Sequence, residues 1–316
     1  MFDYDKREVV AISKSNNFLI NNTEKVLRLT NVLNFVNRTE FGEYLCLKGG
    51  TAINLFLLDL PRLSVDIDYD FSFNCSKEEM LSMRKLITDK IINYMINDGY
   101  QLSDNSKYYH SLDSLVFSYF TTSGSNDNLK IEINYSNRVH VFSPILKTKA
   151  LVLGKEVTTN MLSLYDLIGS KINALINRTV PRDFYDFYNL LMNSKYDYNL
   201  LKKVVIFYLV VGSNDSISVD EKIKICFERI NKIGYNKLRD TLVPLLHKQE
   251  KLDIVKMKQF VLSELEKIIV LNTNERLFIE EFNRGNFNQQ TLFEQYEVND
   301  LSTHPMIIWK IEQHTK

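Results

Sequence analysis

The chain has 316 residues, of which 45% are hydrophobic and 25% charged, a composition typical of a folded protein with room for two domains. Its 39 basic and 39 acidic residues cancel, which argues against a large non-specific nucleic-acid surface but still allows a local basic groove. Cys46, Cys75 and Cys226 form neither a CxxC pair nor a disulfide pattern, which favours the reducing cytoplasm. The start lacks an apolar signal-peptide core, and the longest apolar run, residues 204–211, is too short to span a bilayer, so we expect a cytoplasmic protein without membrane contact.

The first half of the chain predicts alternating helices and strands. The expected elements are a helix over 21–38 with Asn22 or Thr23 as N-cap, a strand over 43–48, a short apolar helix over 51–60, a strand over 63–73, a helix over 76–100 capped by Ser76 and Glu79 and ended by Gly99, and strands over 114–122 and 129–136. Helical spacing of apolar residues defines the helices, and alternation defines the strands. We expect these elements to form a small mixed sheet with helices packed on it.

From about residue 161 the pattern becomes almost wholly helical. Helices are expected over 163–178, 181–193, 204–211, 221–234, 242–253 and 257–271. The sequence therefore predicts an α+β protein with two domains, a mixed-sheet domain over residues 1–160 and a helical domain over residues 161–316.

Two aspartates project from one face of the strand over 63–73. Asp66 and Asp68 are two residues apart and therefore share a face, with Asp70 at the same parity further along. A divalent cation would relieve their repulsion, because Mg²⁺ prefers carboxylate oxygens. If the strand that bears Glu132 is a neighbour, three acids converge as in a two-metal site, which activates a hydroxyl and neutralises leaving pyrophosphate. The alternative is that these acids only line a solvent-exposed strand face.

Gly49, Gly50 and Thr51 stand between a predicted strand and a predicted helix. Glycine adopts positive φ and allows close approach of the backbone, and the N–H groups at a helix start bind phosphate. The alternative is a tight turn without a ligand. The aspartates that follow shortly afterwards favour a phosphate.

A second group of charged residues lies on two predicted helices. Lys171 falls on the apolar stripe of the helix over 163–178, where a lysine is costly unless it meets an anion. The alternative is that it snorkels past the edge of the core. Arg178 lies two turns further on the same face, which favours a shared anionic partner. Asp183 and Asp186 share one stripe of the next helix, although Asp183 could instead cap that helix.

The segment KGGTAINLFLLDLPRLSVDIDYDF resembles the signature of the nucleotidyltransferase superfamily related to DNA polymerase beta, which is Gly-Gly or Gly-Ser, ten or slightly more residues, then Asp-x-Asp. The leading Lys48 and the form LSVDID resemble the AbiEii/AbiGii toxin family of bacterial abortive-infection and toxin–antitoxin systems. A second block, KINALINRTVPRDFYDFYNLL, resembles the Lys…Arg, Arg-Asp-x-x-Asp segment of that family. The resemblance covers about residues 40–195 and leaves residues 200–316 unassigned.

This resemblance implies a toxin that inhibits growth in antiviral defence by transferring a nucleoside monophosphate from an NTP, with Mg²⁺, to an acceptor hydroxyl on tRNA. It also implies a cognate antitoxin that acts without tight protein–protein contact. The nucleotide is expected to contact Lys48, Gly49, Gly50, Thr51, Ser64 and Arg178, the metal to bind Asp66, Asp68 and Glu132, and the catalytic residues to be Asp66, Asp68, Lys171, Asp183 and Asp186. Relatives are discussed as self-modifying at the position of Ser64, but we prefer to interpret Ser64 as a strand-edge hydroxyl.

Two other functions remain open. The acceptor could be a protein or a small molecule, or the chain could be a nucleotide-binding interaction module without chemistry. Three acids together with Lys171 favour chemistry, because simple binding needs fewer carboxylates near phosphate. An RNA contact would have to come from a local basic cluster. Lys147, Lys149 and Lys155 are one candidate, and residues 237–258 are another that is diluted by acids.

Overall fold

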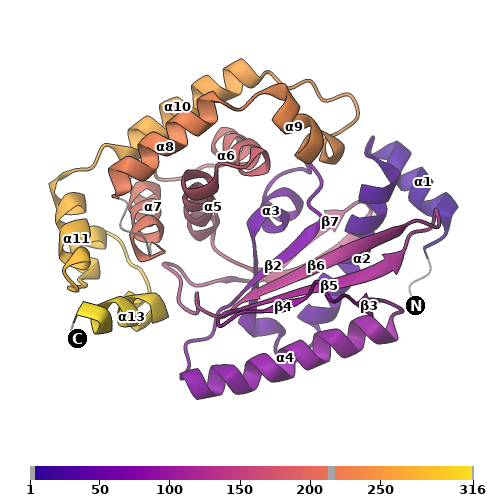
Figure 1. Ribbon diagram of the computed structural model, residues 1–316, viewed down its shortest axis with the longest axis horizontal. Helices are drawn as coiled ribbons and strands as arrows, with labels where there is room; N and C mark the ends of the chain where they lie inside the picture. The colour runs from indigo at the N-terminus through magenta and orange to yellow at the C-terminus, as the bar shows by residue number, and fades with distance from the viewer. Residues whose placement is uncertain (1–3, 213–217, 315–316) are drawn as a thin grey trace. The chain divides into compact units, whose positions relative to one another are not determined.

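The computed structural model describes residues 4–212 and 218–314 (Figure 1). The chain divides into two compact units. The first comprises Met1–Arg138, Pro144–Met161 and Pro244–Glu250, and the second comprises Val139–Ser143, Leu162–Val243 and Lys251–Lys316. The main break therefore falls between Met161 and Leu162, beside the boundary expected at residue 160. Two short segments pack with the unit of the opposite half.

In the described part of the chain, eight strands form one mixed sheet, which belongs to the first unit. The strands are β1 Leu45–Lys48, β2 Asp66–Phe71, β3 Gln101–Leu102, β4 Lys107–Tyr108, β5 Leu112–Phe120, β6 Asn126–Asn134, β7 Ile145–Val152 and β8 Lys155–Met161. Their order is β3-β5-β6-β2-β1-β8-β7, with β4 paired to β5. The central strand β2 runs antiparallel to β1 and parallel to β6.

Helices cover both faces of this sheet. They are α1 Lys6–Ser15, α2 Ile20–Asn37, α3 Gly49–Ala52 with the π-helical turn η2 Ile53–Leu57, and α4 Lys77–Asn97. The helices α2 and α4 lie on the apolar face, since Arg84 of α4 pairs with Asp113 of β5 at 2.6 Å and Phe35 of α2 stacks on Tyr94 of α4 at 3.6 Å. The short helix α3 of the first unit lies on the opposite face (Figure 1). Polar side chains occupy the part of that face that α3 does not cover.

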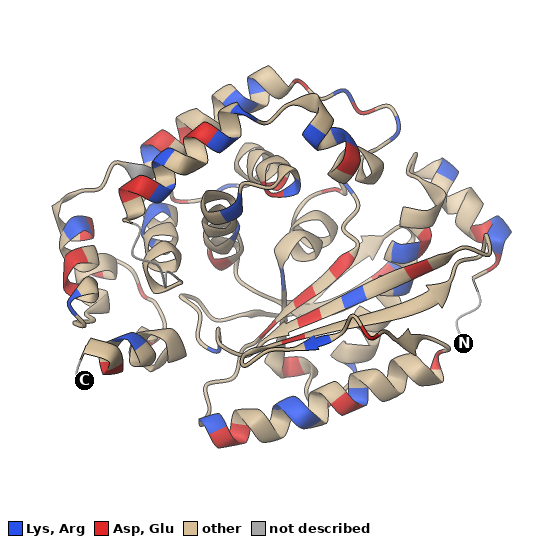
Figure 2. Ribbon diagram, in the orientation of Figure 1, with Lys and Arg blue, Asp and Glu red and all other residues tan. Residues whose placement is uncertain are grey.

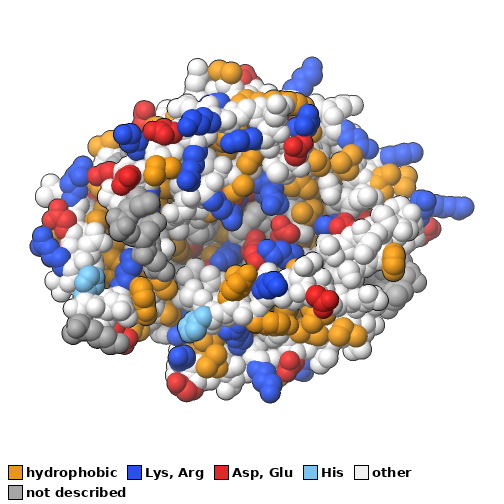
Figure 3. Space-filling view, in the orientation of Figure 1, with side chains coloured by type: hydrophobic (Ala, Val, Ile, Leu, Met, Phe, Trp, Pro, Cys, Tyr) orange, Lys and Arg blue, Asp and Glu red, His pale blue; other side chains and the backbone are white. Residues whose placement is uncertain are grey.

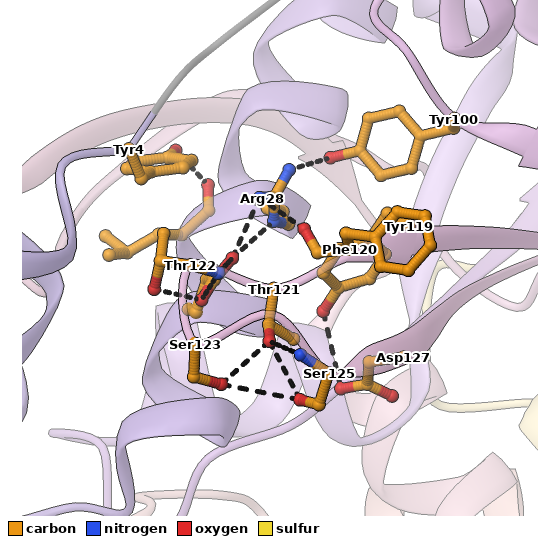
Figure 4. Close-up of polar contacts among 12 residues, drawn as sticks. Tyr4, Arg28, Tyr100, Tyr119, Phe120, Thr121, Thr122, Ser123, Ser125 and Asp127 are labelled. Carbon is orange, nitrogen blue, oxygen red and sulfur yellow. Dashed lines mark hydrogen bonds and ion pairs between the residues drawn. The ribbon is translucent and has the colours of Figure 1, made fainter.

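A buried ion pair ties α2 to the turn between β5 and β6 (Figure 4). The Glu24 side chain is fully buried and accepts hydrogen bonds from Arg28 Nη2 at 2.8 Å and from the Thr122 backbone N–H at 2.9 Å. The Arg28 guanidinium lies 4.4 Å from the centre of the Tyr119 ring and 5.7 Å from that of Tyr4. Because both charges are fully partnered, they fix the position of α2 against the far end of the sheet.

The second unit is built of helices. They are α5 Leu164–Arg178, α6 Pro181–Asn193, α7 Tyr198–Val211, α8 Val219–Asn231, α9 Tyr235–Thr241, α10 Ile254–Ile269, α11 Thr273–Asn283, α12 Gln289–Phe293 and α13 Pro305–His314. The apolar run expected to be a buried helix is α7, whose residues 204–211 are all buried. Asp166 of α5 accepts hydrogen bonds from the backbone N–H groups of Val141 and Phe142, which holds residues 139–143 in this unit. The mixed sheet and the helical second unit confirm the α+β prediction.

Two local predictions were wrong, in each case because a backbone or side-chain group is used elsewhere. The helix α2 begins after Leu19, not at Asn22 or Thr23, because the Asn22 amide donates to the Pro244 carbonyl and the Thr23 hydroxyl donates to the Leu19 carbonyl. The short apolar helix expected over residues 51–60 is present with shifted bounds, as α3 Gly49–Ala52 followed by the π-helical turn η2 Ile53–Leu57.

The helix expected over 242–253 is absent from this described stretch, which contains a 3₁₀ turn, Val243–Leu245, and otherwise lies mostly outside helices. Pro244 has no backbone N–H to donate to a helix. The Leu245 carbonyl accepts from the Leu63 N–H and the Lys248 N–H donates to the Asn17 carbonyl, so these groups are not available for helical hydrogen bonds. Strands β7 and β8 were not anticipated. A bulge between Ile145 and Thr148 and the edge position of β7 weaken the alternation that would reveal it.

No helix in residues 4–212 and 218–314 is both long enough and apolar enough to cross a membrane.

Candidate active site

A row of polar side chains crosses the face of the sheet that α2 and α4 leave uncovered. In the register of the strands, Asp68 of β2 lies between Lys48 of β1 and Glu132 of β6, and Glu132 lies beside Ser114 of β5. Laterally paired residues share a face, so these four side chains project together. The strands that bear Asp68 and Glu132 are therefore neighbours, which was the condition set for these acids to converge. Figure 2 shows the acidic positions side by side on β2 and β6.

Carboxylates dominate the charge at this row. Burial raises the pKa of Asp68 to about 6; Lys48 lowers it, and the negative charges of Asp66 and Glu132 raise it further. The pKa of Glu132 is lowered, because the hydrogen bond and charge of Lys130, 2.7 Å away, outweigh the effect of burial. An ionised Asp68 is therefore short of positive charge in the protein alone.

Magnesium fits this donor set. Among the described residues, no three His, Cys, Asp or Glu side chains lie close enough together to hold a metal ion by themselves. Mg²⁺ usually binds one or two carboxylates and takes its other ligands from water and substrate phosphates. Asp66 and Asp68 could supply that pair, and the raised pKa of Asp68 marks the position where a cation would complete the charge balance.

The glycine turn is shaped by the aspartate next to it. Gly49 has φ +68°, and a Cβ on it would lie 2.6 Å from Asp68 Oδ2. The turn thus uses glycine in the way that the sequence predicts, with positive φ and a close approach, although the nearest group is a carboxylate of the chain itself.

The hydroxyls that follow the turn are engaged within the protein. Thr51 is fully buried, and its Oγ1 lies in a short hydrogen bond to the Asp66 carbonyl and 3.0 Å from Ser64 Oγ. A carbonyl only accepts, so Thr51 donates its one proton to Asp66 and accepts the proton of Ser64. Both hydroxyls therefore hold the start of β2 in place, which agrees with the interpretation of Ser64 as a strand-edge hydroxyl.

Lys48 has a partner that the sequence analysis left without a role. Its Nζ lies 2.5 Å from Oδ1 of Asp70, a residue that is 2% exposed. Asp70 shares the face of Asp66 and Asp68. Lys48 lies opposite Asp68 on the antiparallel strand β1 and reaches Asp70 diagonally. The sequence showed only that Asp70 shares the strand face of Asp66 and Asp68. What was missing was the pairing of β1 with β2.

The second unit holds a separate buried group of charges. Lys171 Nζ of α5 lies 2.6 Å from Asp183 Oδ1 and 2.6 Å from Asp186 Oδ2, both on α6. Arg178 reaches Asp183 with its Nε at 2.6 Å while most of its own side chain is exposed. Burial alone would raise the pKa of Asp183, but Lys171 and Arg178 outweigh it, so this pKa is lowered.

These contacts decide between the alternatives for the second group. The Lys171 side chain is 6% exposed and its ammonium is bound by two carboxylates, so it does not snorkel to solvent. Asp183 is directed to Lys171 and Arg178 and does not cap α6, whose N-cap is Val180 with Pro181 as first residue. The anion that the sequence required for Lys171 is thus present in the chain itself.

The lysines considered for RNA are partly neutralised by neighbouring acids. Lys155 pairs with Glu8 at 2.9 Å, and Lys149 lies 3.7 Å from Glu156. Over the face drawn in Figure 3, basic and acidic side chains are mixed, without a broad region of one sign. This surface fits the net charge of zero.

A glycine turn packed against an Asp-x-Asp strand in a mixed sheet is the arrangement of a nucleotidyltransferase. The family described as nucleotidyl transferase AbiEii toxin, type IV TA system, matches residues 34–276. The chain therefore belongs to the AbiEii family of nucleotidyltransferase toxins, as its two sequence motifs predicted. The match also extends beyond residue 195, where the sequence motifs had ended, and includes much of the helical unit.

The fold is similar to that of a solved toxin of the same kind. The structure of MenT4, the nucleotidyltransferase toxin Rv2826c from Mycobacterium tuberculosis H37Rv, matches with a TM-score of 0.64 and 14% identity, over 88% of this chain and 94% of that chain. At this identity the likeness concerns the fold alone. No curated protein sequence matches the chain.

Proposed function

We propose that this protein transfers a nucleoside monophosphate from an NTP to an acceptor hydroxyl at the 3′ end of tRNA. The observation that supports this most directly is Asp68 itself, which lies beside the Gly49 turn, pairs with Glu132 of the neighbouring strand, shares a strand face with Asp66, and has a pKa raised to about 6. Such a concentration of carboxylates is costly without a ligand and suits a nucleotide that brings a divalent cation.

The residues of the first unit would bind and orient the nucleotide. Asp66 and Asp68 would hold Mg²⁺, with Glu132 as a third carboxylate beside Asp68. Bound Mg²⁺ supplies positive charge to the triphosphate and to the departing pyrophosphate. Gly49 and Gly50 would admit the phosphates close to the backbone. Thr51 and Ser64 would keep the strand start fixed through their mutual hydrogen bond.

Lys171 and Arg178 of the second unit would contact nucleotide phosphate, as the family motif implies. Asp183 and Asp186 pair with Lys171 and hold it in one orientation. Arg178 is exposed enough to meet a phosphate while its Nε stays on Asp183. In the reaction, a bond forms between the acceptor oxygen and the α-phosphorus, and the bond from that phosphorus to pyrophosphate breaks.

Transfer of label from each of four α-³²P-labelled NTPs tests this function. Total RNA, total protein and purified tRNA with and without its 3′ end are incubated with wild-type protein and with Asp66→Asn. We expect Mg²⁺-dependent labelling of intact tRNA alone, lost in the variant. Label in protein or in a small molecule would assign that acceptor instead. Saturable nucleotide binding without any labelling would identify a binding module without chemistry.

The biological setting follows from the family and is part of the proposal. We expect the protein to act in the cytoplasm, to inhibit growth when expressed, and to be neutralised by a cognate antitoxin without tight contact, as in abortive infection. Expression of the wild type and of Asp66→Asn in a bacterial host tests the toxicity. Equal growth of both strains would contradict it.

A further inference from the structure

A short segment from the helical half of the chain packs against the catalytic unit. Residues 244–250, here called the strap, lie in sequence between α9 and α10 of the second unit but belong to the first. The Asn22 side chain donates to the Pro244 carbonyl at 2.6 Å, and the Lys248 N–H donates to the Asn17 carbonyl at 2.8 Å. The strap is therefore bonded to α2 through Asn22 and to the turn between α1 and α2 through Asn17.

The middle of the strap pairs with the loop that leads into β2. The Leu63 N–H donates to the Leu245 carbonyl at 2.8 Å, and Arg62 and Leu246 form an antiparallel bridge. All four of these residues are buried. Leu63 stands three residues before Asp66, so the strap fixes the backbone immediately before the proposed metal ligands.

His247 fastens the same loop at a second point. Its Nε2 lies 3.1 Å from the Leu60 carbonyl and its Nδ1 lies 3.0 Å from the Asn16 carbonyl, while its ring stacks on Phe18 at 4.1 Å. Leu60 has φ +48°, a conformation that leucine seldom adopts and that needs support from its surroundings. Carbonyl oxygens only accept and a neutral imidazole has one N–H, so the neutral ring donates to one of these two carbonyls and only the imidazolium donates to both.

Hydrogen bonds of two hydroxyl groups connect the loop before β2 to the start of that strand. Leu63 is followed directly by Ser64, whose hydroxyl meets Thr51, and Thr51 in turn donates to the Asp66 carbonyl. The chain of contacts thus runs from His247 through the loop to the strand that bears the two aspartates. It joins residues about 180 positions apart in the sequence.

We propose that His247 is a positioning residue for the nucleotide site, holding the 58–65 loop so that Asp66 and Asp68 meet the nucleotide in register. The proposal rests on the proposed function for what the aspartates bind. It predicts that loss of the two ring nitrogens lowers the rate of transfer more than it weakens nucleotide binding. Small displacements of reacting groups cost about 10²-fold in rate, whereas binding tolerates them better.

Two substitutions separate the hydrogen bonding of His247 from its ring stacking. His247→Phe keeps a ring that can stack on Phe18 and removes both ring nitrogens, and His247→Gln restores an amide donor. His110→Gln is the matched control, because the His110 side chain is exposed and lies outside the strap. For each variant, kcat and KM for the NTP are measured, together with amide hydrogen exchange of peptides over residues 58–66 and over β5 and β6.

We expect His247→Phe to lower kcat at least about tenfold with KM changed less than about twofold, and to speed exchange over 58–66 while β5 and β6 keep their protection. His247→Gln should recover part of both, and the control should match wild type. Wild-type kcat in His247→Phe, or equal loss of protection in β5 and β6, would overturn the proposal. If the wild type transfers no nucleotide, the proposed function fails, and exchange over 58–66 alone decides whether His247 holds the loop.

Discussion

Gly49 and Asp68 face each other so closely that a single added carbon on Gly49 would lie 2.6 Å from the Asp68 carboxylate. The glycine therefore makes room for a carboxylate of its own chain as well as allowing φ +68° at the start of α3. This relationship explains why the glycine turn and the Asp-x-Asp strand occur together, since each restricts the residue that the other position can hold.

Gly49→Ala is expected to abolish nucleotide transfer and to destabilise the protein by more than the conformational penalty alone, which is about 1–2 kcal/mol for a residue with a Cβ at positive φ. Gly124→Ala is the matched control, because Gly124 has φ +83° and its added Cβ would meet nothing within 4 Å. Urea unfolding and transfer assays of both variants check this. If the two variants lose equal stability and equal activity, the contact with Asp68 is not the cause.

Asp66→Asn and Asp68→Asn are each expected to abolish transfer and growth inhibition while the fold is kept. Asparagine has the size of aspartate, but it lacks the negative charge that Mg²⁺ needs. Circular dichroism confirms the fold, and labelled-nucleotide transfer at saturating Mg²⁺ measures activity. Transfer at the wild-type rate by either variant would exclude that aspartate as a ligand.

The contribution of Asp68 to the stability of the metal-free protein should fall as the pH rises from about 4 to about 6. The pKa of Asp68 rises from 3.8 to about 6 on folding, so the folded state binds this proton more tightly than the unfolded state in that range. Asp68→Asn should lack this contribution and be more stable above pH 6 by on the order of 1–2 kcal/mol, since each pKa unit is worth about 1.4 kcal/mol and the site is partly exposed. Urea unfolding with a chelator at several pH values measures it. Parallel pH dependence in both proteins would refute this assignment.

Features of the site that depend on residues close together in the sequence could be predicted, and features that depend on the arrangement of distant strands could not. The shared face of Asp66 and Asp68 follows from the period of a strand, and the pairing with Glu132 needed only that two strands be neighbours. The Lys48–Asp70 pair could not be predicted, because it depends on the order of strands in the sheet.

The strap was missed for a different physical reason. Residues 242–253 have apolar spacing compatible with a helix, but their backbone groups bond to residues from the start of the chain. Such tertiary bonds override local preference, and no local pattern reveals them. The sequence predicted an anion beside Lys171 but did not identify it. The anions are the two aspartates that follow within fifteen residues, Asp183 and Asp186.

Lys171→Met should destabilise the protein by about 3–5 kcal/mol, because it leaves Asp183 and Asp186 buried beside each other without their shared cation. Adding Asp183→Asn and Asp186→Asn to this variant should recover part of the loss, since the uncompensated charges are removed. Urea unfolding of the single and triple variants tests this. A single variant as stable as the wild type would show that the ion pairs add nothing to the fold.

Lys171→Ala, where it is folded, should also weaken nucleotide use at least about tenfold, the scale of one charge-assisted hydrogen bond of about 1.5–3 kcal/mol. Lys171→Arg should rescue poorly, because the planar guanidinium does not fit between two carboxylates that hold an ammonium. Nucleotide titration of each variant at a temperature where it is folded provides the measurement. Unchanged saturation and rate would assign Lys171 to the fold alone.

Binding of tRNA should depend only weakly on salt. The chain has no net charge, and two of the lysines first considered for RNA, Lys149 and Lys155, are paired with glutamates. A single-stranded 3′ end needs few phosphate contacts, and each one adds about 0.7 to the slope of log K against log salt concentration. Two to four contacts therefore predict a slope between about −1.4 and −2.8. Fluorescence anisotropy with labelled tRNA between 50 and 200 mM KCl, about the range over which such slopes are resolved, measures it. A slope steeper than about −5 would mean that a broad basic surface binds the RNA duplex, and recognition of the 3′ end alone would then be wrong.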